Sequence, residues 1–411
     1  MLASITVGLL LLVLVYLLPI QPIKQHVFDS TELLVKEGNY TEFWPEKFVR
    51  MHPYNINLRT MLLNNRGMAR DNHTDALMLG AAAYDDEGQT TALQKALLVY
   101  HDDTAMHDSV LGLQQLSLTG VATAPESYPR YWHGYLAVLK PLLLLFTYRQ
   151  IRYLNVVLLL SLYGMVCLGL YRRRGVKTCI SFILASLTTF PVVIPFCMQY
   201  CTMTYITLGG MNYMLWRKSR GGNKHEIEFF FLIGILAAYI DFLTYPMMAL
   251  GCLLIVRTVI VDRKVQIREQ ILLCVSWAAG YGTMWASKWF LADIFTDKKV
   301  IRDALNQAIH RTVGSSDQLE AHVNPIKTVA ANLSCFTNVI FIVLILIIVT
   351  VWIVGIIRNG WDINALSYLF IVFLPIVWMC VLQNHSYDHS SFTYRSLMVS
   401  FWGLLQMIET K

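Results

Sequence analysis

Hydrophobic and polar residues form long separate blocks along this chain. One apolar segment covers Leu2 to Ile20, roughly a hundred water-compatible residues follow, and near-continuous apolar runs extend from there to the C-terminus. About 20 apolar residues make a helix that crosses the hydrocarbon core of a bilayer. The pattern therefore predicts an all-α polytopic membrane protein with a large helical extracytoplasmic loop after the first span.

The composition agrees with this prediction. Of the 411 residues, 55% are hydrophobic and only 15% are charged, which is too apolar for an ordinary soluble domain. The formal net charge of +6 does not indicate nucleic-acid binding, because the basic residues gather at the ends of apolar runs, where they act as topology signals. All 8 cysteines lie in or beside apolar runs, so we expect no disulfide framework in the extracytoplasmic loop.

The charge distribution predicts the orientation in the membrane. Loops rich in Lys and Arg stay on the cytoplasmic side, whereas residues 21–130 contain more acidic than basic residues and are expected outside. An outside Arg130 and an inside Arg172 require an odd number of crossings between them. The basic clusters that follow three apolar runs are Arg172, Arg173, Arg174 and Lys177; Arg217, Lys218, Arg220 and Lys224; and Arg263, Lys264 and Arg268.

Two apolar stretches lie between Arg130 and Arg172, so one of them does not cross. The first, Tyr131 to Tyr148, contains Lys140 and Pro141 and suits a helix along the outer interface. The second, Ile151 to Tyr171, is then a true span. Further spans are predicted at residues 179–197, 200–216, 227–240, 246–261, 271–290, 333–357, 366–382 and 396–408.

These spans predict about ten transmembrane helices with both termini in the cytoplasm. The expected organisation is a first transmembrane helix (1–20), an extracytoplasmic loop (21–130), an interfacial helix (131–149), transmembrane helices (150–291), a second extracytoplasmic loop (292–331) and C-terminal transmembrane helices (332–411).

Two stretches carry a wider pattern. One is RYWHGYLAVLKPLLLLFTYRQIRYLNVVLLLSLYGMVCLGLYRRRG, from Arg130 to Gly175, and the other is LIGILAAYIDFLTYPMMALGCLLIV, from Leu232 to Val256. Together with the long outer loop they resemble the GT-C superfamily of polytopic membrane glycosyltransferases. In that superfamily an interfacial helix begins with His-Pro-Pro-Leu-like residues, where this chain has His133 and Gly134, and a later turn has a lysine where this chain has Tyr245.

The resemblance implies an inverting transfer of a sugar from a polyprenyl-phosphate-linked donor to a glycan or lipid acceptor. The active site would be extracytoplasmic in an integral membrane protein, with the plasma membrane as the expected location. Partners would be the donor, the acceptor and membrane lipids, with no nucleic acid. The resemblance does not decide whether a divalent cation is a cofactor, because branches of the superfamily differ in metal use.

A reaction of this type needs a carboxylate that takes the proton of the acceptor hydroxyl. The stretch ARDNHTDALML, from Ala69 to Leu79, offers Asp71 before a helix-like run and Asp75 one turn later on the same face. We expect catalysis at Asp71 or Asp75, with Asp71 ahead. The alternative is that Asp71 caps the helix and Asp75 interacts with its dipole.

Cations are needed to hold the leaving phosphate. Lys288 lies near the predicted outer end of an apolar span, where a cation is costly unless it is paired or reaches the interface. Snorkelling to lipid headgroups is the alternative for this lysine. Arg395 begins the last span at the same level, and Arg130 and His133 begin the interfacial helix, so we expect these four side chains around the donor phosphate.

A third group of residues is expected to line the acceptor cavity. Asp241 and Tyr245 occupy a turn at the outer surface, and the segment between two late spans contains His385, Asp388 and His389. Spacing of four residues between the histidines would permit a metal if this segment were helical. Solvated or substrate-binding histidines are the simpler interpretation.

Two other classes of protein stay open. A lipid-linked glycan transporter or flippase without catalysis would carry ionisable residues deep in several spans, and the predicted spans are nearly free of charge in their middles. A membrane O-acyltransferase would need a buried catalytic histidine, whereas His133 and His385 are both expected at the interface.

Overall fold

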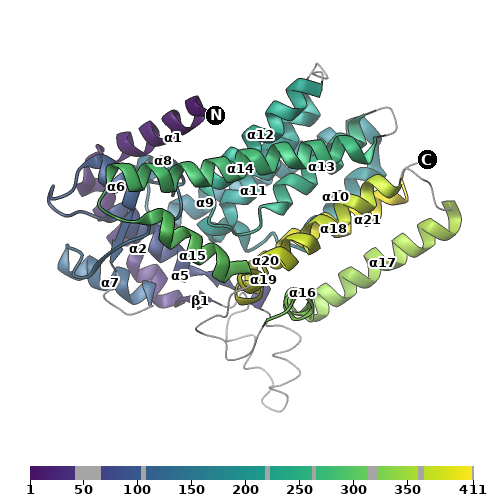
Figure 1. The fold of residues 1–411 in the computed structure, drawn as a ribbon. Coiled ribbons are helices and arrows are strands. Elements are labelled where there is room, and N and C mark those ends of the chain that lie inside the picture. The colour runs from purple at the N-terminus through teal and green to yellow at the C-terminus, as the bar shows by residue number, and fades with distance from the viewer. Residues whose placement is uncertain are drawn as a thin grey trace, which may run out of the picture.

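The structure, a computed structural model, describes residues 1–41, 66–102, 108–217, 223–261, 265–312, 323–359 and 365–409. These residues form an α-helical protein in which the few strands are two or three residues long (Figure 1). The fold class predicted from the sequence is confirmed to this extent.

The N-terminal apolar segment is shorter than predicted. Helix α1 (Leu2–Val15) ends before Ile20, and α2 (Ile20–Glu37) leaves it at an angle of 81°. Pro19 lies at the N-cap of α2, where the missing N–H of proline does not matter but its ring prevents continuation of the preceding helix. The predicted single helix over residues 1–20 is therefore a helix with a sharp break after it.

The large polar loop folds into the helices α5 (Asn72–Ala83), α6 (Ala92–Leu98) and α7 (Ser109–Thr119). Helices α5 and α7 pack against α2, whereas α6 packs against α1. Two short antiparallel ladders join β1 (Tyr40–Thr41) to β2 (Arg70–Asp71) and β3 (Tyr100–Asp102) to β4 (Pro125–Ser127), and η1 (Arg66–Met68) precedes β2. After the location predicted from the sequence, we call residues 21–41, 66–102 and 108–130 the ectodomain.

The predicted interfacial stretch contains one short helix. Helix α8 (Leu136–Leu143) has 8 residues, which gives a length of about 12 Å and is too short to cross a bilayer alone. A capping box of Thr147 and Gln150 then starts α9 (Tyr148–Arg174). The sequence analysis predicts that this span begins at Ile151, three residues after the first residue of α9, Tyr148.

The remaining helices form the bundle. They are α10 (Val176–Leu187), η2 (Ile194–Phe196), α11 (Met198–Trp216), α12 (Asn223–Ile240), α13 (Met247–Ile260), α14 (Ile267–Phe295), α15 (Val300–Thr312), α16 (Pro325–Ser334), α17 (Val339–Asn359), α18 (Ala365–Val381), α19 (Gln383–Asp388), α20 (Ser390–Thr393), η3 (Tyr394–Leu397) and α21 (Met398–Met407).

Three predicted segments of the bundle need correction. The span expected at 179–197 ends as a helix at Leu187, because Pro191 and Pro195 turn the chain into η2. The span expected at 333–357 is divided between α16 and α17. The polar stretch before the last span is also helical, as α19, α20 and η3.

Close contact between α12 and α14 is made possible by two glycines. A Cβ on Gly234 would lie 2.1 Å from the carbonyl oxygen of Trp277, and one on Gly280 would lie 2.1 Å from that of Phe231. Small residues of this kind let two helix backbones touch in an apolar environment. The pair forms one side of the bundle, with α14 running its full length (Figure 1).

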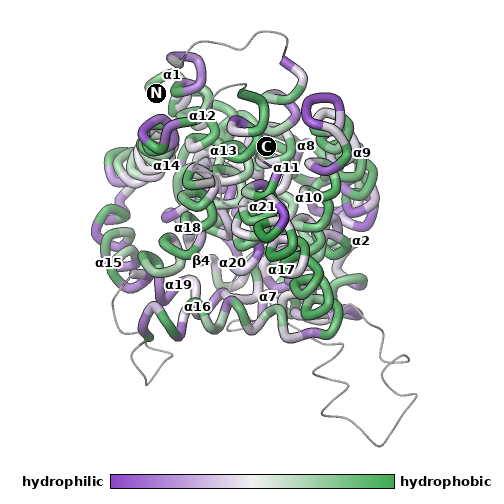
Figure 2. Tube along the Cα trace, turned by 90° about the vertical axis from the view of Figure 1, so that its right-hand side faces the viewer, coloured by the Kyte–Doolittle hydropathy of each residue, from purple (hydrophilic) through white to green (hydrophobic). Residues whose placement is uncertain are grey.

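By length and composition, two of the described helices can cross a membrane. They are Tyr148–Arg174 and Val339–Arg358, and the bent pair α1 and α2 makes a third if it counts as one span. Shorter apolar helices occur at Val176–Leu187, Met247–Ile260 and Leu366–Val381. The structure thus supports two or three membrane-length helices where the sequence predicted about ten. Figure 2 shows hydrophobic residues along α10 and α17.

The described residues of the first two basic clusters include Arg173, Arg174 and Arg217, which lie at one end of the bundle. Lys218, Arg220, Arg263 and Lys264 fall outside the described residues. Arg173 donates to the carbonyl oxygen of Leu215, at 3.2 Å from Nε, and Arg174 donates to that of Val259. These carbonyls belong to the last turns of α11 and α13, so the ends of α9, α11 and α13 lie together. The ectodomain lies at the other end of α9, on the left in Figure 1.

A buried ion pair joins the ectodomain to the bundle. Arg152, at the start of α9, donates from Nη1 to both carboxylate oxygens of Glu37 at 2.9 and 3.0 Å, and from Nη2 to Asn72 Oδ1 at 2.8 Å. Arg70 adds a 2.7 Å bond to the same carboxylate. Arg152 is only 3% exposed, so this contact is shielded from water and salt.

Two buried lysines make a second connection. Lys140 Nζ donates to the carbonyl oxygen of Ala82 at 2.8 Å, and Lys288 Nζ donates to that of Ala96 at 2.7 Å. Both carbonyls lie in the last turn of an ectodomain helix, where a cation interacts favourably with the helix dipole. The C-terminal ends of α5 and α6 are therefore held by side chains from α8 and α14.

We predict that Arg152→Met destabilises the junction. Removing one partner of a buried ion pair leaves the other charge unpaired, and we expect the free energy of unfolding to fall by about 3 kcal/mol. Urea unfolding of the protein in detergent micelles measures this change. Lys224→Met is the control, because Lys224 pairs with Glu228 on the surface, at 3.9 Å and 91% exposed; equal effects of both variants would contradict the assignment.

Candidate functional site

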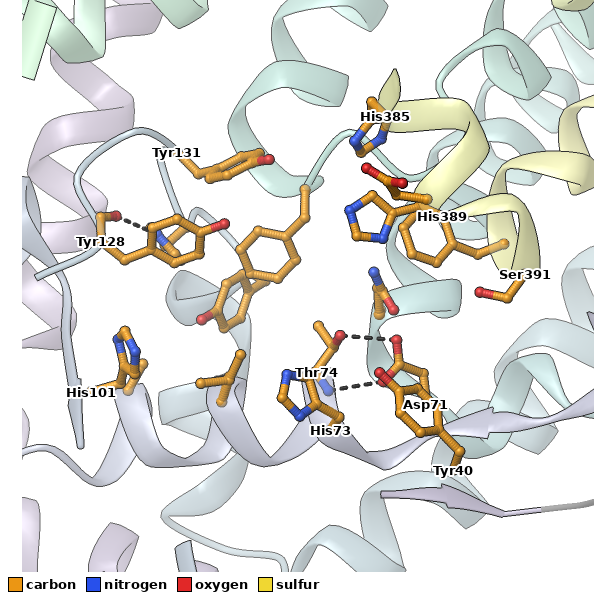
Figure 3. A pocket seen from close by; sticks show the side chains of 18 of the residues that line it. Tyr40, Asp71, His73, Thr74, His101, Tyr128, Tyr131, His385, His389 and Ser391 are labelled. Carbon is orange, nitrogen blue, oxygen red and sulfur yellow. Dashed lines mark hydrogen bonds between the residues drawn. The ribbon is translucent and has the colours of Figure 1, made fainter. Parts of the chain in front are cut away.

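A polar cavity of about 620 Å³ lies between the ectodomain and the end of the bundle. Figure 3 shows Asp71, His73 and Thr74 on one side of it, with His385, His389 and Ser391 facing them from the C-terminal segment. Tyr128 and Tyr131 close a further side, on the segment that leads to α8. Residues separated by more than 300 positions therefore meet at one cavity.

Asp71 lies in the cavity wall as the N-cap of α5. Its carboxylate accepts hydrogen bonds from the backbone N–H and the hydroxyl of Thr74, both at 2.9 Å (Figure 3). Burial raises the pKa of Asp71, while the bonds from Thr74 and the charges of His73 and Arg395 act against that rise. The capping role expected from the sequence is confirmed, and it places the carboxylate at the cavity surface.

Asp75 lies beneath the cavity wall and does not line it. It accepts hydrogen bonds from the Tyr148 hydroxyl and from the backbone N–H groups of Met198 and Gln199, at 3.1 and 3.3 Å. These amides open α11, so the carboxylate occupies the positive end of that helix. Burial raises the pKa of Asp75 to about 7, although the bond from Tyr148 lowers it. The position indicates an anchor for α11.

Three histidines of the cavity lining have a lowered pKa. Burial lowers the pKa of His133 and His385 well below the ordinary value and brings that of His389 to about 4. Nε2 of His133 bonds the carbonyl oxygen of Tyr128 at 2.8 Å, and Nε2 of His385 bonds that of Leu243 at 2.8 Å. The Nδ1 atoms of both rings are buried and have no hydrogen-bond partner among the described residues.

Three of the four cations expected around a donor phosphate lie outside the cavity lining. Lys288 binds the Ala96 carbonyl and faces the Trp132 ring at 5.4 Å. Arg395 donates to the carbonyl oxygens of Ser391 and Gly67, at 2.9 and 2.8 Å.

The third, Arg130, pairs with Asp303 at 3.1 Å and lines a neighbouring groove. His133 alone of the four lines the cavity. The structure does not bring these side chains together, because backbone carbonyls already occupy the donor groups of Lys288 and Arg395.

The residues expected around an acceptor divide into two groups. His385, Asp388 and His389 line the cavity. Asp241 instead accepts hydrogen bonds from the N–H and hydroxyl of Thr244, at 2.7 and 2.5 Å.

Tyr245 donates to the Tyr200 carbonyl oxygen at 2.5 Å. Asp241 and Tyr245 are both buried and absent from the cavity lining. They hold the turn between α12 and α13 against α11, which corrects their expected place.

Sequence reasoning missed several cavity residues. Arg311, from the last turn of α15, bonds the Tyr131 hydroxyl and lies against its ring at 5.4 Å. His73, Tyr40 and Gln199 also line the cavity. The one signal available for Arg311 was its place at the end of an amphipathic helical pattern in the second outer loop. Nothing in that pattern points toward residues 180 positions earlier.

A metal finds no ready site here. The described residues contain no group of three or more His, Cys, Asp or Glu side chains arranged to hold a metal ion. His385 and His389 do lie on adjacent turns, with ring centroids 4.7 Å apart, but His389 stacks on Phe392 at 5.1 Å. A divalent cation at this position would need additional ligands from a substrate.

Comparison with known proteins adds no relative. No family model, no curated protein and no solved structure matches the chain. Functional inference therefore rests on the cavity itself.

The described lining of the cavity combines two carboxylates of raised pKa, Asp71 and Asp388, with one guanidinium and a wall of rings. A carboxylate in this setting can take a proton from a hydroxyl group, and a guanidinium can stabilise an anion that forms nearby. Tyr128, Tyr131, Tyr135 and Phe242 offer aromatic faces and hydroxyl groups to a ligand. The chemistry suits a polar, largely uncharged substrate beside one anionic group.

We predict that Asp75 makes stability depend on pH. Its folded-state pKa of about 7 exceeds the ordinary value of 3.8, so the folded state binds the proton more tightly and loses stability as pH rises from about 4 to 7. The thermal midpoint in detergent should fall over this range, and Asp75→Asn should flatten the profile. Parallel profiles for the two proteins would contradict the assignment.

Proposed function

We propose that the chain is an integral-membrane glycosyltransferase of the GT-C type. It moves a sugar from a polyprenyl-phosphate donor to a glycan or lipid acceptor on the extracytoplasmic face. The observation that carries the proposal is the position of the Asp71 carboxylate in one wall of a cavity that also contains Arg311. That cavity lies at the end of the bundle away from the basic clusters, as a site on the outer face requires.

Asp71 is the proposed general base. Its carboxylate accepts the proton of the acceptor hydroxyl while the acceptor oxygen bonds to the anomeric carbon of the donor sugar. The bond from that carbon to the phosphate oxygen breaks, and the phosphate leaves with the electron pair. Thr74 orients the carboxylate through two hydrogen bonds, and aromatic rings around the cavity exclude water.

The proposal includes a polytopic arrangement with about ten crossings. Support comes from large apolar side chains that the short helices expose, including Ile180 on α10, Leu236 on α12 and Phe373 on α18. Apolar surface of this extent marks contact with lipid in a folded protein. Helices shorter than the bilayer are accommodated by local thinning or by neighbouring segments.

Transport without catalysis has less support. A conduction path needs ionisable groups that face a cavity through the bundle. Arg257, the buried cation of α13, is instead paired with Glu226 and Glu269, at 2.7 and 2.6 Å.

We predict that Asp71→Asn reduces sugar transfer by about 10²- to 10⁴-fold, the usual contribution of a general base. Asparagine caps a helix as well as aspartate does, so the fold should survive. Release of farnesyl phosphate from farnesyl-phosphate sugars measures the rate. Asp108→Asn is the matched control, because Asp108 caps α7 through a 2.9 Å bond from Leu111 and lies outside the cavity; wild-type transfer by the Asp71 variant would refute the assignment.

We also predict opposite accessibility at the two ends of the bundle. A membrane-impermeant maleimide should label Gln89→Cys, in the exposed turn between α5 and α6, in intact cells. Lys224→Cys, at the basic end, should react only after permeabilisation. Labelling in intact cells at the second position alone would reverse the orientation and remove the proposal.

A further inference from the structure

The short segment that leads to Asp71 is held by side chains from the C-terminal part of the chain. Arg395, in η3, donates from Nη2 to the carbonyl oxygen of Gly67 at 2.8 Å, and the Tyr394 hydroxyl donates to the same oxygen at 2.8 Å. Gly67 lies in η1, just before the strand that ends at Asp71. A Cβ on Gly67 would lie 2.7 Å from the Tyr394 ring, so this close approach requires glycine.

The same guanidinium also contacts the C-terminal wall of the cavity. Its Nη1 donates to the carbonyl oxygen of Ser391 at 2.9 Å. Ser391 lines the cavity from the C-terminal segment, whereas Asp71 lines it from the ectodomain (Figure 3). Helix α20, which contains Ser391, packs against η1. Arg395 therefore joins, through two backbone carbonyls, the segments that bring both residues to the cavity.

Arg395 is a buried cation without a close counter-ion. Its side chain is 0% exposed, and the described residues place no carboxylate within 4.0 Å of it. Its Cζ lies 3.9 Å from the centroid of the Tyr200 ring and 4.9 Å from that of Tyr394, and these cation–π contacts offset part of the cost of burial. Hydrogen bonds to two carbonyls do not require a charge, since a neutral amide also donates. An unpaired buried cation is costly, which indicates that the charge itself has a role.

Asp71 is a carboxylate on which this charge acts. Burial raises the pKa of Asp71, and the charge of Arg395 acts against that rise, together with Thr74 and His73. Arg395 carries its positive charge at every accessible pH, whereas the other titratable groups are neutral or negative over part of the range. The further titratable groups that interact with Asp71 are Tyr40, Asp75, Cys197 and Tyr200.

We propose that Arg395 is a positioning residue for Asp71: it fixes residues 67–71 against the C-terminal wall, and its charge favours the ionised form of the carboxylate. Arg395 does not line the cavity, so it acts through Asp71 and does not touch a substrate. One part rests on the proposed function, namely that this carboxylate takes the proton of the acceptor hydroxyl. A general base works only in its ionised form, so Arg395 extends the reaction to lower pH.

The acid side of the pH–rate profile of sugar transfer tests the charge. Arg395→Gln keeps an amide donor and removes the charge. We expect the acid limb to move to higher pH, and the rate at about pH 5, relative to the plateau, to fall by about tenfold, as for loss of one nearby opposite charge. Tyr394→Phe is the matched control, because it removes a hydrogen bond to the same Gly67 carbonyl and leaves the charge. It should lower the rate by the same factor at every pH.

Infrared titration of the protein in detergent follows the Asp71 carboxyl without relying on sugar transfer. The band of the protonated carboxyl, assigned by its loss in Asp71→Asn, should persist to higher pH in Arg395→Gln than in the wild type or Tyr394→Phe. The same titration in wild type and in a folded Arg395→Gln would overturn the proposal. A shifted titration in a protein that transfers no sugar would support the role of Arg395 and refute the proposed function, so the two failures are distinguishable.

Arg395→Lys provides a second test if Arg395→Gln does not fold. Lysine keeps the charge, but its single ammonium lacks the planar fork that reaches both carbonyls. We expect the carboxyl to titrate as in the wild type, with slower sugar transfer at every pH. A titration moved to higher pH would contradict the role of the charge, and a wild-type rate would contradict the role of the two hydrogen bonds.

Discussion

The arrangement of the site depends on the buried contact between Arg152 and Glu37. Arg152 begins a membrane-length helix, whereas Glu37 ends the first helix of the ectodomain and is linked through Asn72 to the start of α5. The neighbouring Tyr148 donates its backbone N–H to Ser30 and its hydroxyl to Asp75. One turn of α9 therefore sets the height and orientation of the helix that presents Asp71. Without this contact the position of α5, which forms the cavity wall containing Asp71, would not be fixed.

The cavity achieves polarity with few charges. Burial lowers the pKa of His133, His385 and His389, and Arg311 is the one arginine or lysine among the lining residues that the structure describes. A charge in such surroundings acts strongly, because little water is present to screen it. Lys288 and Arg395 donate to backbone carbonyls and so stabilise the fold, while the charge of Arg395 also acts against the raised pKa of Asp71.

Local signals in the sequence predicted the α-helical class and the possible cap at Asp71. They also indicated that residues 131–149 do not form a crossing helix, and α8 has the short length this requires. Local signals did not predict contacts between residues that are distant in the chain. Lys288 looked like a free cation until its carbonyl partner, 192 positions away, was in place. Arg311 looked like a loop residue, and only the packing of α15 against Tyr131 gives it a role.

The glycine contact between α12 and α14 affects the far end of α14, where that helix meets the segment before α8 and helix α6. Carbonyl oxygens limit the approach of Gly234 and Gly280 at 2.1 Å from where a side chain would begin, so even a methyl group would force the two helix axes apart. Farther along α14 lie the Met284 carbonyl that accepts the Trp132 indole N–H, and the Lys288 ammonium. A small lateral shift at the crossing would be amplified along α14 and would displace the contacts that Met284 and Lys288 make with Trp132 and Ala96.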